Sequence, residues 1–340
     1  MQLLTDTMLL IGGITVFLFG LKLVGSNTEK LSGEKVNAVI KKMTRNRLFA
    51  CGVGAVTTAF AQSSVATNVI AISFVNTGAI SLLGACAVVV GTNVGTTMTA
   101  QLVSLSFVGN FSVTAIGSLI AFIGFIMSAL FKNRVSLLGN VFLGFGLVFI
   151  GIKLMSDQAD SFKEYEWFQN AFLIKSAPIL LLNGFFITAV CQSSSVVTSM
   201  LVVLASKGVM TFDCSVYLIM GANIGTCVSV VLLSYRKCAA ARRVAWFNVL
   251  FNLLGSLVFY FAFVFSGSFL FDLFAKTSPS VARQIANFHT LFNLVSGVFT
   301  LVALKPLVRL LEIIVKDGKQ ENKGKTEKRT VFTAVKSRTV

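Results

Sequence analysis

Two polar stretches interrupt an otherwise apolar chain, and each begins with glutamine followed by serine. Gln62 opens the run QSSVATNVI, and Gln192 opens the run QSSSVVTSM, at a spacing of 130 (192 − 62). Hydroxyl and amide side chains are neutral donors and acceptors. Their donors suit an oxyanion, and their oxygens suit a hard cation such as Na⁺. The residue types therefore indicate ion binding.

Other landmarks repeat at nearly the same spacing. GTNVGT begins at Gly91 and GANIGT at Gly221, again at a spacing of 130 (221 − 91). GLKL begins at Gly20 and GIKL at Gly151, where the spacing is 131 (151 − 20). Landmarks that recur in one order at one spacing indicate an internal duplication, in which each half contributes the same polar elements.

The amino-acid composition indicates the environment in which these polar stretches lie. Of the 340 residues, 55% are apolar and only 12% are charged, and the mean hydropathy is +0.83. Soluble domains carry about a quarter charged residues, so the chain is predicted to be a polytopic membrane protein. The net charge of +16 lies mostly in short loops and the tail, as in cytoplasmic loops. It therefore does not indicate nucleic-acid binding.

The apolar segments divide into seven expected spans and two segments that carry the Gln-Ser-Ser stretches, at 48–77 and 177–206. Each span is long enough to cross a hydrocarbon layer of about 30 Å as a helix. The spans are expected at residues 8–25, 80–105, 111–131, 136–155, 213–235, 244–266 and 286–304.

Loop charge predicts how the two polar segments meet the membrane. If each is a re-entrant hairpin, the basic loops at 30–47, 132–134 and 236–243 and the basic tail all face the cytoplasm, and the acidic residues of 157–166 face outside. If both segments instead crossed the membrane fully, the basic loop at 132–134 would face outside and the acidic residues of 157–166 would face inside, against the positive-inside rule. A hairpin plus three crossings in each half makes the second half inverted, so the two hairpins meet near the midplane. The N-terminus is then expected outside and the basic tail in the cytoplasm, as in a bacterial cytoplasmic (inner) membrane protein.

The predicted fold class is therefore an all-α polytopic membrane protein with an inverted-topology repeat. Each half holds one re-entrant hairpin and three crossings, and one further span follows. The expected parts are a first repeat at 1–134, a second repeat at 135–266, a loop and last helix at 267–310, and a basic, disordered cytoplasmic tail at 311–340.

The absence of charge from the spans restricts the chemistry. No Asp, Glu or Arg lies in the middle of an expected span, which disfavours a proton relay built on carboxylates. A dry anion without a cationic partner is costly, so co-bound cations are expected. A serine nucleophile needs a base, and the single histidine, His289, lies in the last span. We therefore expect no enzyme and no cofactor beyond co-transported Na⁺.

At these residues the chain resembles the bacterial branch of the type II sodium–phosphate cotransporter family. The similar motifs are the two QSS stretches, GTNVGTT, GANIGTC, NVLFNLLG at 248–255 and HTLFNLVSG at 289–297, and they cover about residues 8–310. The resemblance implies phosphate binding by Gln62, Ser63, Ser64, Gln192, Ser193, Ser194 and Ser195. It implies Na⁺ binding at Thr58, Asn93, Gly95, Thr96, Thr188, Asn223, Gly225 and Thr226.

The function that this resemblance implies is import of inorganic phosphate with Na⁺ by alternating access. Transport of another oxyanion or a carboxylate remains open, as does a phosphate sensor that does not transport. The expected partners are phosphate, Na⁺ and the lipid bilayer. A homodimer in which each monomer is a transport unit also remains open.

Overall fold

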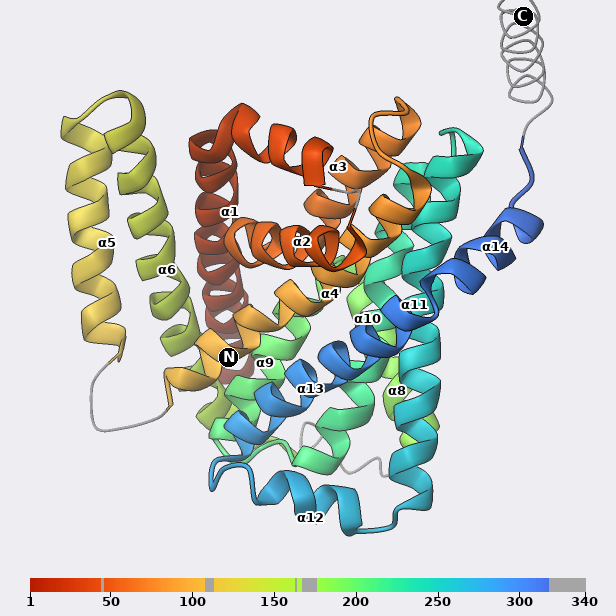
Figure 1. Ribbon diagram of the computed structural model, residues 1–340. Coiled ribbons are helices and arrows are strands. Elements are labelled where there is room, and N and C mark those ends of the chain that lie inside the picture. The colour runs from red at the N-terminus through yellow and green to blue at the C-terminus, as the bar shows by residue number, and fades with distance from the viewer. Residues whose placement is uncertain (44–45, 108–112, 163, 167–175, 318–340) are drawn as a thin grey trace, which may run out of the picture.

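A computed structural model describes residues 1–43, 46–107, 113–162, 164–166 and 176–317, and these are helical with no strand (Figure 1). The helices are α1 (Gln2–Met43), α2 (Arg47–Ala61), α3 (Ser64–Asn76), α4 (Leu82–Leu105), α5 (Val113–Leu130), α6 (Asn133–Phe162), α8 (Ala177–Cys191), α9 (Ser194–Ser206), α10 (Phe212–Ser234), α11 (Ala239–Phe265), α12 (Phe269–Ala275), α13 (Val281–Val302) and α14 (Leu304–Ile314).

Seven of the described helices are long and apolar enough to cross a membrane, namely α1, α4, α5, α6, α10, α11 and α13. Each coincides with one of the seven expected spans. The four helices that flank the Gln-Ser-Ser stretches are shorter, at 13 or 15 residues. At 1.5 Å per residue they extend only about 20 Å, so none could cross alone. The chain is a multi-span membrane protein.

Several helices run beyond the expected spans. The expected loop at 30–47 is wrong up to Met43, because α1 continues to that residue. Helix formers such as Glu29, Lys30 and Leu31 extend α1 past its apolar part. The acidic segment is likewise helical as far as Phe162. Helix α14 crosses the expected start of the tail at 311, and residues 318–340 lie outside the described part of the chain.

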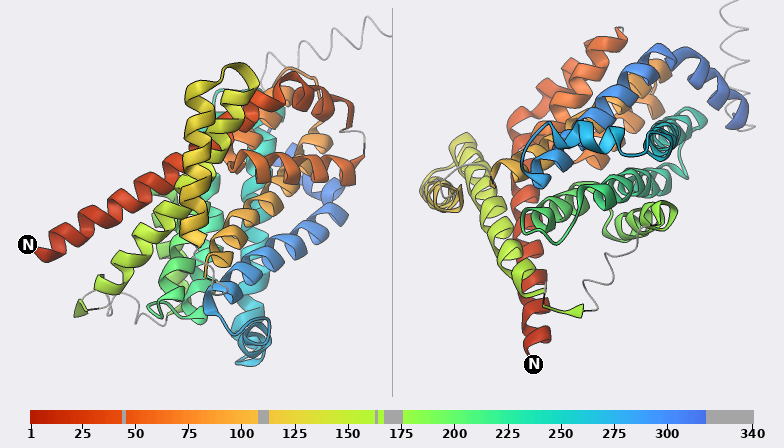
Figure 2. Two further views of the ribbon diagram at one scale, coloured as in Figure 1. Left: turned by 90° about the vertical axis from the view of Figure 1, so that its left-hand side faces the viewer. Right: turned by 90° about the horizontal axis from the view of Figure 1, so that it is seen from below.

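Helices α1, α5 and α6 form a layer on one side of the molecule. Figures 1 and 2 show α5 and α6 farthest from the remaining helices, with α1 packed along α6. The α1–α6 crossing is close because glycines lie in it. A Cβ on Gly20 would lie 2.7 Å from the carbonyl oxygen of Gly144, and one on Gly151 would lie 2.5 Å from the backbone nitrogen of Phe17.

The duplication is visible in the way two helix pairs pack. Helix α2 packs along α4, and α8 packs along α10. A Cβ on Gly91 would lie 1.9 Å from the carbonyl oxygen of Cys51, and one on Gly221 would lie 1.9 Å from that of Leu181. Both members of the second pair follow those of the first at the motif spacing of 130 (181 − 51, 221 − 91). The same backbone contact therefore recurs in each half.

Helices α11 and α13 continue this correspondence. Each carries one of the two similar runs, 248–255 in α11 and 289–297 in α13. Helix α11 packs on α10, α4 and α3, and α13 packs on α4, α9 and α10. Each therefore contacts both long helices and one of the second short helices. These contacts tie the two halves together around the region where the short helices meet.

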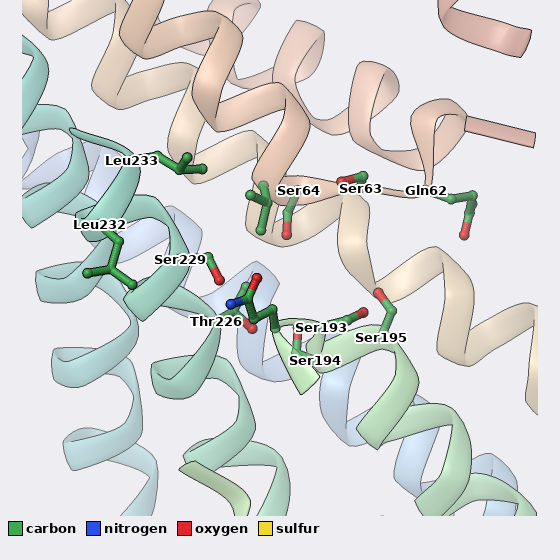
Figure 3. Close-up of a pocket in the computed structure, with 12 residues that line it drawn as sticks. Gln62, Ser63, Ser64, Ser193, Ser194, Ser195, Thr226, Ser229, Leu232 and Leu233 are labelled. Carbon is green, nitrogen blue, oxygen red and sulfur yellow. The ribbon is translucent and has the colours of Figure 1, made fainter. Parts of the chain in front are cut away.

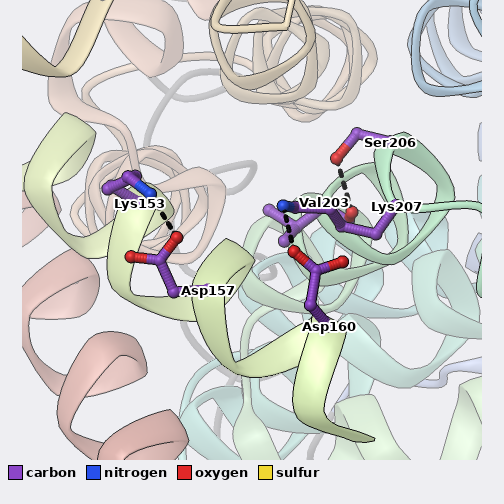
Figure 4. Close-up of polar contacts among 6 residues, drawn as sticks. All are labelled: Lys153, Asp157, Asp160, Val203, Ser206 and Lys207. Atoms are coloured by element: carbon purple, nitrogen blue, oxygen red, sulfur yellow. Dashed lines mark hydrogen bonds and ion pairs between the residues drawn. The ribbon is translucent and has the colours of Figure 1, made fainter. Parts of the chain in front are cut away.

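Two ion pairs lie at α6 and the end of α9 (Figure 4). The Lys207 ammonium, just after α9, pairs with Asp160 of α6, and Lys153 pairs with Asp157 one turn further along α6. Three of these four side chains are exposed and Lys207 is partly exposed, and such surface pairs contribute at most about 1 kcal/mol. Of the two, only the Lys207–Asp160 pair links α6 to the end of α9, because the Lys153–Asp157 pair lies within α6.

Candidate functional site

The first Gln-Ser-Ser stretch breaks a helix. Helix α2 ends at Ala61, Gln62 adopts a left-handed conformation (φ 51°), and Ser63 is extended (φ −148°) before α3 begins at Ser64. A left-handed residue is a common helix terminator, and serine is a preferred residue before a helix. The Ser63 hydroxyl accepts a hydrogen bond from the Ala66 backbone nitrogen at 3.2 Å. The sequence therefore specifies both the stop and the restart.

The second stretch repeats this backbone geometry. Gln192 is left-handed (φ 56°) and Ser193 is extended (φ −149°), and α9 begins at Ser194. The Gln192 backbone nitrogen donates to the Thr188 carbonyl oxygen at 2.7 Å, which closes α8. One difference matters for binding. Ser193 makes no side-chain capping bond, so its hydroxyl is not engaged by its own helix.

The two breaks face one cavity of about 300 Å³ (Figure 3). This volume is several times the roughly 30 Å³ that a water molecule occupies in the liquid. Figure 3 shows the α3 side and the α9 side on opposite sides of the cavity. All seven residues predicted to contact phosphate line it: Gln62, Ser63, Ser64, Gln192, Ser193, Ser194 and Ser195.

The cavity is polar but carries no charged side chain among its described lining residues. The groups there that could contact an anion are hydroxyls, amides and the backbone N–H groups at the starts of α3 and α9. The first backbone N–H groups of a helix have no partner within the helix, and the helix dipole adds partial positive charge there. Two such starts at one cavity can hold an oxyanion without a basic side chain.

The residues predicted to bind Na⁺ are distributed differently. Only Thr226 of the eight lines the cavity, and its hydroxyl donates to the Ala222 carbonyl oxygen at 3.1 Å. Its counterpart Thr96 makes the corresponding bond to the Thr92 carbonyl oxygen at 2.8 Å. The glycines Gly95 and Gly225 lie where α4 and α10 cross the preceding short helices. The cavity thus does not gather the whole predicted Na⁺ set.

Thr58 and Thr188 occupy corresponding positions one turn before the two glutamines. Their side chains are buried, at 1% and 0% exposure, and neither hydroxyl has a hydrogen-bond partner. A Cβ on Gly95 would lie 2.9 Å from the Thr58 Cβ, and one on Gly225 would lie 2.8 Å from the Thr188 Cβ. A buried hydroxyl without a partner costs about 1–3 kcal/mol, which is a reason to look for a ligand.

Asn93 belongs to an asparagine cluster that joins α4 to α11. Its Nδ2 donates to Asn248 Oδ1 at 3.0 Å, and its Oδ1 accepts from Asn252 Nδ2 at 3.1 Å. Asn252 also donates to the Cys227 sulfur at 3.3 Å. In the other half, the buried Nδ2 of Asn223 has no partner. The two predicted asparagines therefore differ in their surroundings.

Other residues at the cavity were not predicted. Ser229, Leu232 and Leu233 of α10 and Val65 of α3 complete its lining. Ser229 is buried, its hydroxyl has no partner, and Figure 3 shows it at the cavity. The spacing of 130 could have found it, because Thr99, another hydroxyl residue, stands at the corresponding position (229 − 130). The leucines carry no sequence signal.

His289 is not among the described residues that line the cavity. It is 1% exposed, and neither ring nitrogen has a hydrogen-bond partner. No base therefore stands beside the serines in the described part of the chain.

Seven membrane-length helices and a polar cavity between two helix breaks describe a multi-span membrane protein with one candidate ion-binding site in the described part of the chain. The chain belongs to the Na+/Pi-cotransporter family, whose model matches residues 16–157 and 171–295. The matched residues include both helix breaks and most of α13.

Two relatives are similar to the chain over most of its length. The chain is 28% identical over 311 residues to "Putative inorganic phosphate export protein YjbB" of Escherichia coli K12, covering 91% of this chain and 55% of that protein. It is 29% identical over 307 residues to "Uncharacterized protein YqeW" of Bacillus subtilis, covering 89% of this chain and 96% of that protein. The chain thus spans about half the length of the YjbB proteins. No solved structure matches it.

Proposed function

We propose that the protein is a secondary active transporter that moves inorganic phosphate together with Na⁺ by alternating access. The single observation that carries this proposal is the shared cavity, where two corresponding helix breaks bring seven hydroxyl and amide residues together. Hydroxyl groups and two helix starts suit a tetrahedral oxyanion. Membership of the Na+/Pi-cotransporter family supports phosphate as that anion.

Na⁺ coupling follows from the lack of charge in the cavity. A multivalent anion in an uncharged site would be left without a compensating cation, at a cost of several kcal/mol. Na⁺ bound nearby would offset that cost. The unpartnered hydroxyl oxygens of Thr58 and Thr188, each one turn from a motif glutamine, are our leading ligands. Their corresponding positions in the two halves suggest two related Na⁺ sites.

An inverted repeat would explain why the breaks face each other. We propose that α2–α3 and α8–α9 are re-entrant hairpins that enter from opposite sides of a bacterial inner membrane. The short helices, the charge of the loops and the opposed sides in Figure 3 support this arrangement. It places the N-terminus outside and the end of α14 on the cytoplasmic side.

The direction of transport depends on the Na⁺ and phosphate gradients across the membrane taken together. A symporter carries phosphate with Na⁺, so an inward Na⁺ gradient drives import, which is our first proposal. Export is the second candidate, because the YjbB relatives are named for phosphate export. The same site serves both directions, since alternating access is reversible.

Purified protein in proteoliposomes tests the proposed function. Radiolabelled phosphate uptake should require an inward Na⁺ gradient, and Ser64→Ala or Ser194→Ala should abolish it, because each removes a cavity hydroxyl at a helix start. Ser128→Ala is the matched control, since the Ser128 hydroxyl bonds within α5. Full uptake by both cavity variants would contradict the site, and absence of uptake by the parent protein would contradict the function.

A further inference from the structure

The two motif glutamines are held differently. In the first half, the Thr99 hydroxyl of α4 donates to Gln62 Oε1 at 2.7 Å. The corresponding hydroxyl in the second half belongs to Ser229 of α10, and it has no hydrogen-bond partner although it is buried. Gln192 lines the same cavity as Ser229 and is the more exposed glutamine. The bond is therefore made in one half and absent in the other.

The lining of the cavity also differs between the ends of α10 and α4. It extends along the last turns of α10, where Leu233 is 53% exposed. The corresponding residue of α4 is Val103 (233 − 130), and it is 0% exposed. The cavity is thus lined by the end of the helix whose hydroxyl lacks a glutamine, and no described residue of α4, whose hydroxyl holds one, lines it.

Polar contacts close the end of α4 against α13. Gln101 Nε2 donates to Thr290 Oγ1 at 2.8 Å, and Arg283 donates to the Ser104 hydroxyl at 3.0 Å. The residue of α10 that corresponds to Gln101 is Val231, which has no polar side chain. The Gln101 contact therefore has no counterpart on α10, whereas Ser104 corresponds to Ser234 (234 − 130), whose hydroxyl donates to the Val231 carbonyl oxygen at 2.8 Å.

We propose that Thr99 and Ser229 are positioning residues that hold the two glutamines in turn, each closing the cavity on its own side. In the state described here Thr99 holds Gln62. In the opposite state Ser229 holds Gln192 and the Thr99 bond is released. This inference rests on the proposed alternating exposure of the cavity, because two states related by exchange of the halves should also exchange their asymmetric contacts.

The expected size of the effect follows from one hydrogen bond. A net contribution of about 0.5–1.5 kcal/mol corresponds to a change of about two- to tenfold in the ratio of the two states. Thr99→Val removes the bond from the present state only, so it should favour the opposite state. Ser229→Ala removes the bond from the opposite state only, so it should favour the present one. The two substitutions should therefore change the ratio of the two states in opposite directions, which general destabilisation of the protein would not do.

Paired cysteine reporters measure this ratio. Leu233→Cys and Val103→Cys are made separately in protein whose six native cysteines are replaced by alanine, and the labelling rate with a maleimide is measured in lipid nanodiscs without phosphate. Thr99→Val should slow labelling at the first reporter and speed it at the second, by about two- to tenfold. Ser229→Ala should slow labelling at the second reporter, and the double variant should return both rates toward those of the parent.

Substitutions on the same two helices provide matched controls. Thr97→Val and Ser215→Ala remove hydroxyl groups that bond only to carbonyl oxygens of their own helix or its first cap, so both reporters should keep the parental rates. Shifts of the same sign in Thr99→Val and Ser229→Ala, or no shift, would overturn the proposal. So would a Val103→Cys reporter that labels in no variant. Because the assay contains no phosphate, its outcome is separate from the uptake experiment.

Discussion

The hydroxyls of Thr58 and Thr188 could serve either helix packing or Na⁺ binding, and the two roles can be told apart. Both are buried without a hydrogen-bond partner, in corresponding places. A group that serves only packing would be better replaced by valine, which has the same shape and no polar atom to bury. A group that holds Na⁺ would be needed whenever the ion is bound. The two roles therefore predict different responses to Na⁺.

Thr58→Val and Thr188→Val should each raise the melting temperature in Na⁺-free detergent by a few degrees, because an unsatisfied hydroxyl costs about 1–3 kcal/mol. The stabilisation that added Na⁺ gives should fall, and the Na⁺ concentration for half-maximal uptake should rise about tenfold. Thermal melts with and without Na⁺ check this. Thr57→Val, at the neighbouring position, serves as the control. Unchanged Na⁺ dependence in both variants would remove them from the Na⁺ site.

At this scale the sequence predicts the members of the cavity that belong to a repeated motif and misses the others. The duplicated Gln-Ser-Ser stretches mark the seven residues that line it. Ser229 stands in no motif, and Leu233 resembles any membrane-facing leucine. Their place at the cavity depends on which face of α10 turns inward. Hydropathy does not identify that face when a helix is apolar on all sides.

Glycine positions control how the short helices approach the long ones. Gly91 and Gly221 allow α4 and α10 to meet the backbones of α2 and α8, and a Cβ at either position would lie 1.9 Å from a carbonyl oxygen. Backbone oxygens cannot move aside as a flexible side chain can. These crossings set the depth at which the breaks at Gln62 and Gln192 lie, so the site depends on them.

Gly91→Ala and Gly221→Ala should therefore each destabilise the protein by about 1–3 kcal/mol or more, because the helices must separate. Lower yield of monodisperse protein and a lower melting temperature are the expected readouts. Gly52→Ala on the exposed side of α2 is the matched control, since its Cβ would meet nothing within 4 Å. Equal stability of all three variants would contradict the close crossing.

The existence of the long helices follows from hydropathy, but their ends do not. All seven expected spans appear, whereas α1 continues to Met43 through a stretch expected to be a loop. The cations of that stretch, such as Lys30 and Lys35, indicate a membrane boundary and not a helix end. Charge marks where the hydrocarbon stops, and a helix rich in Lys and Glu continues beyond it.

For the whole molecule, the proposed coupling predicts that the sign of the Na⁺ gradient sets the sign of the phosphate flux. Proteoliposomes loaded with phosphate and Na⁺ should release phosphate into Na⁺-free buffer, and equal Na⁺ on both sides should stop net movement against a phosphate gradient. Replacement of Na⁺ by choline is the control. Export that persists without a Na⁺ gradient would favour uncoupled export over symport.

The uncharged lining of the cavity also has an electrical consequence. None of its described residues carries a formal charge, so the empty protein can change its exposure without moving side-chain charge of the cavity through the membrane field. Each elementary charge that crosses 100 mV exchanges about 2.3 kcal/mol with the field. Under the proposed coupling, voltage should therefore act mainly on the loaded protein, and the current should report the net charge of phosphate plus its Na⁺ ions.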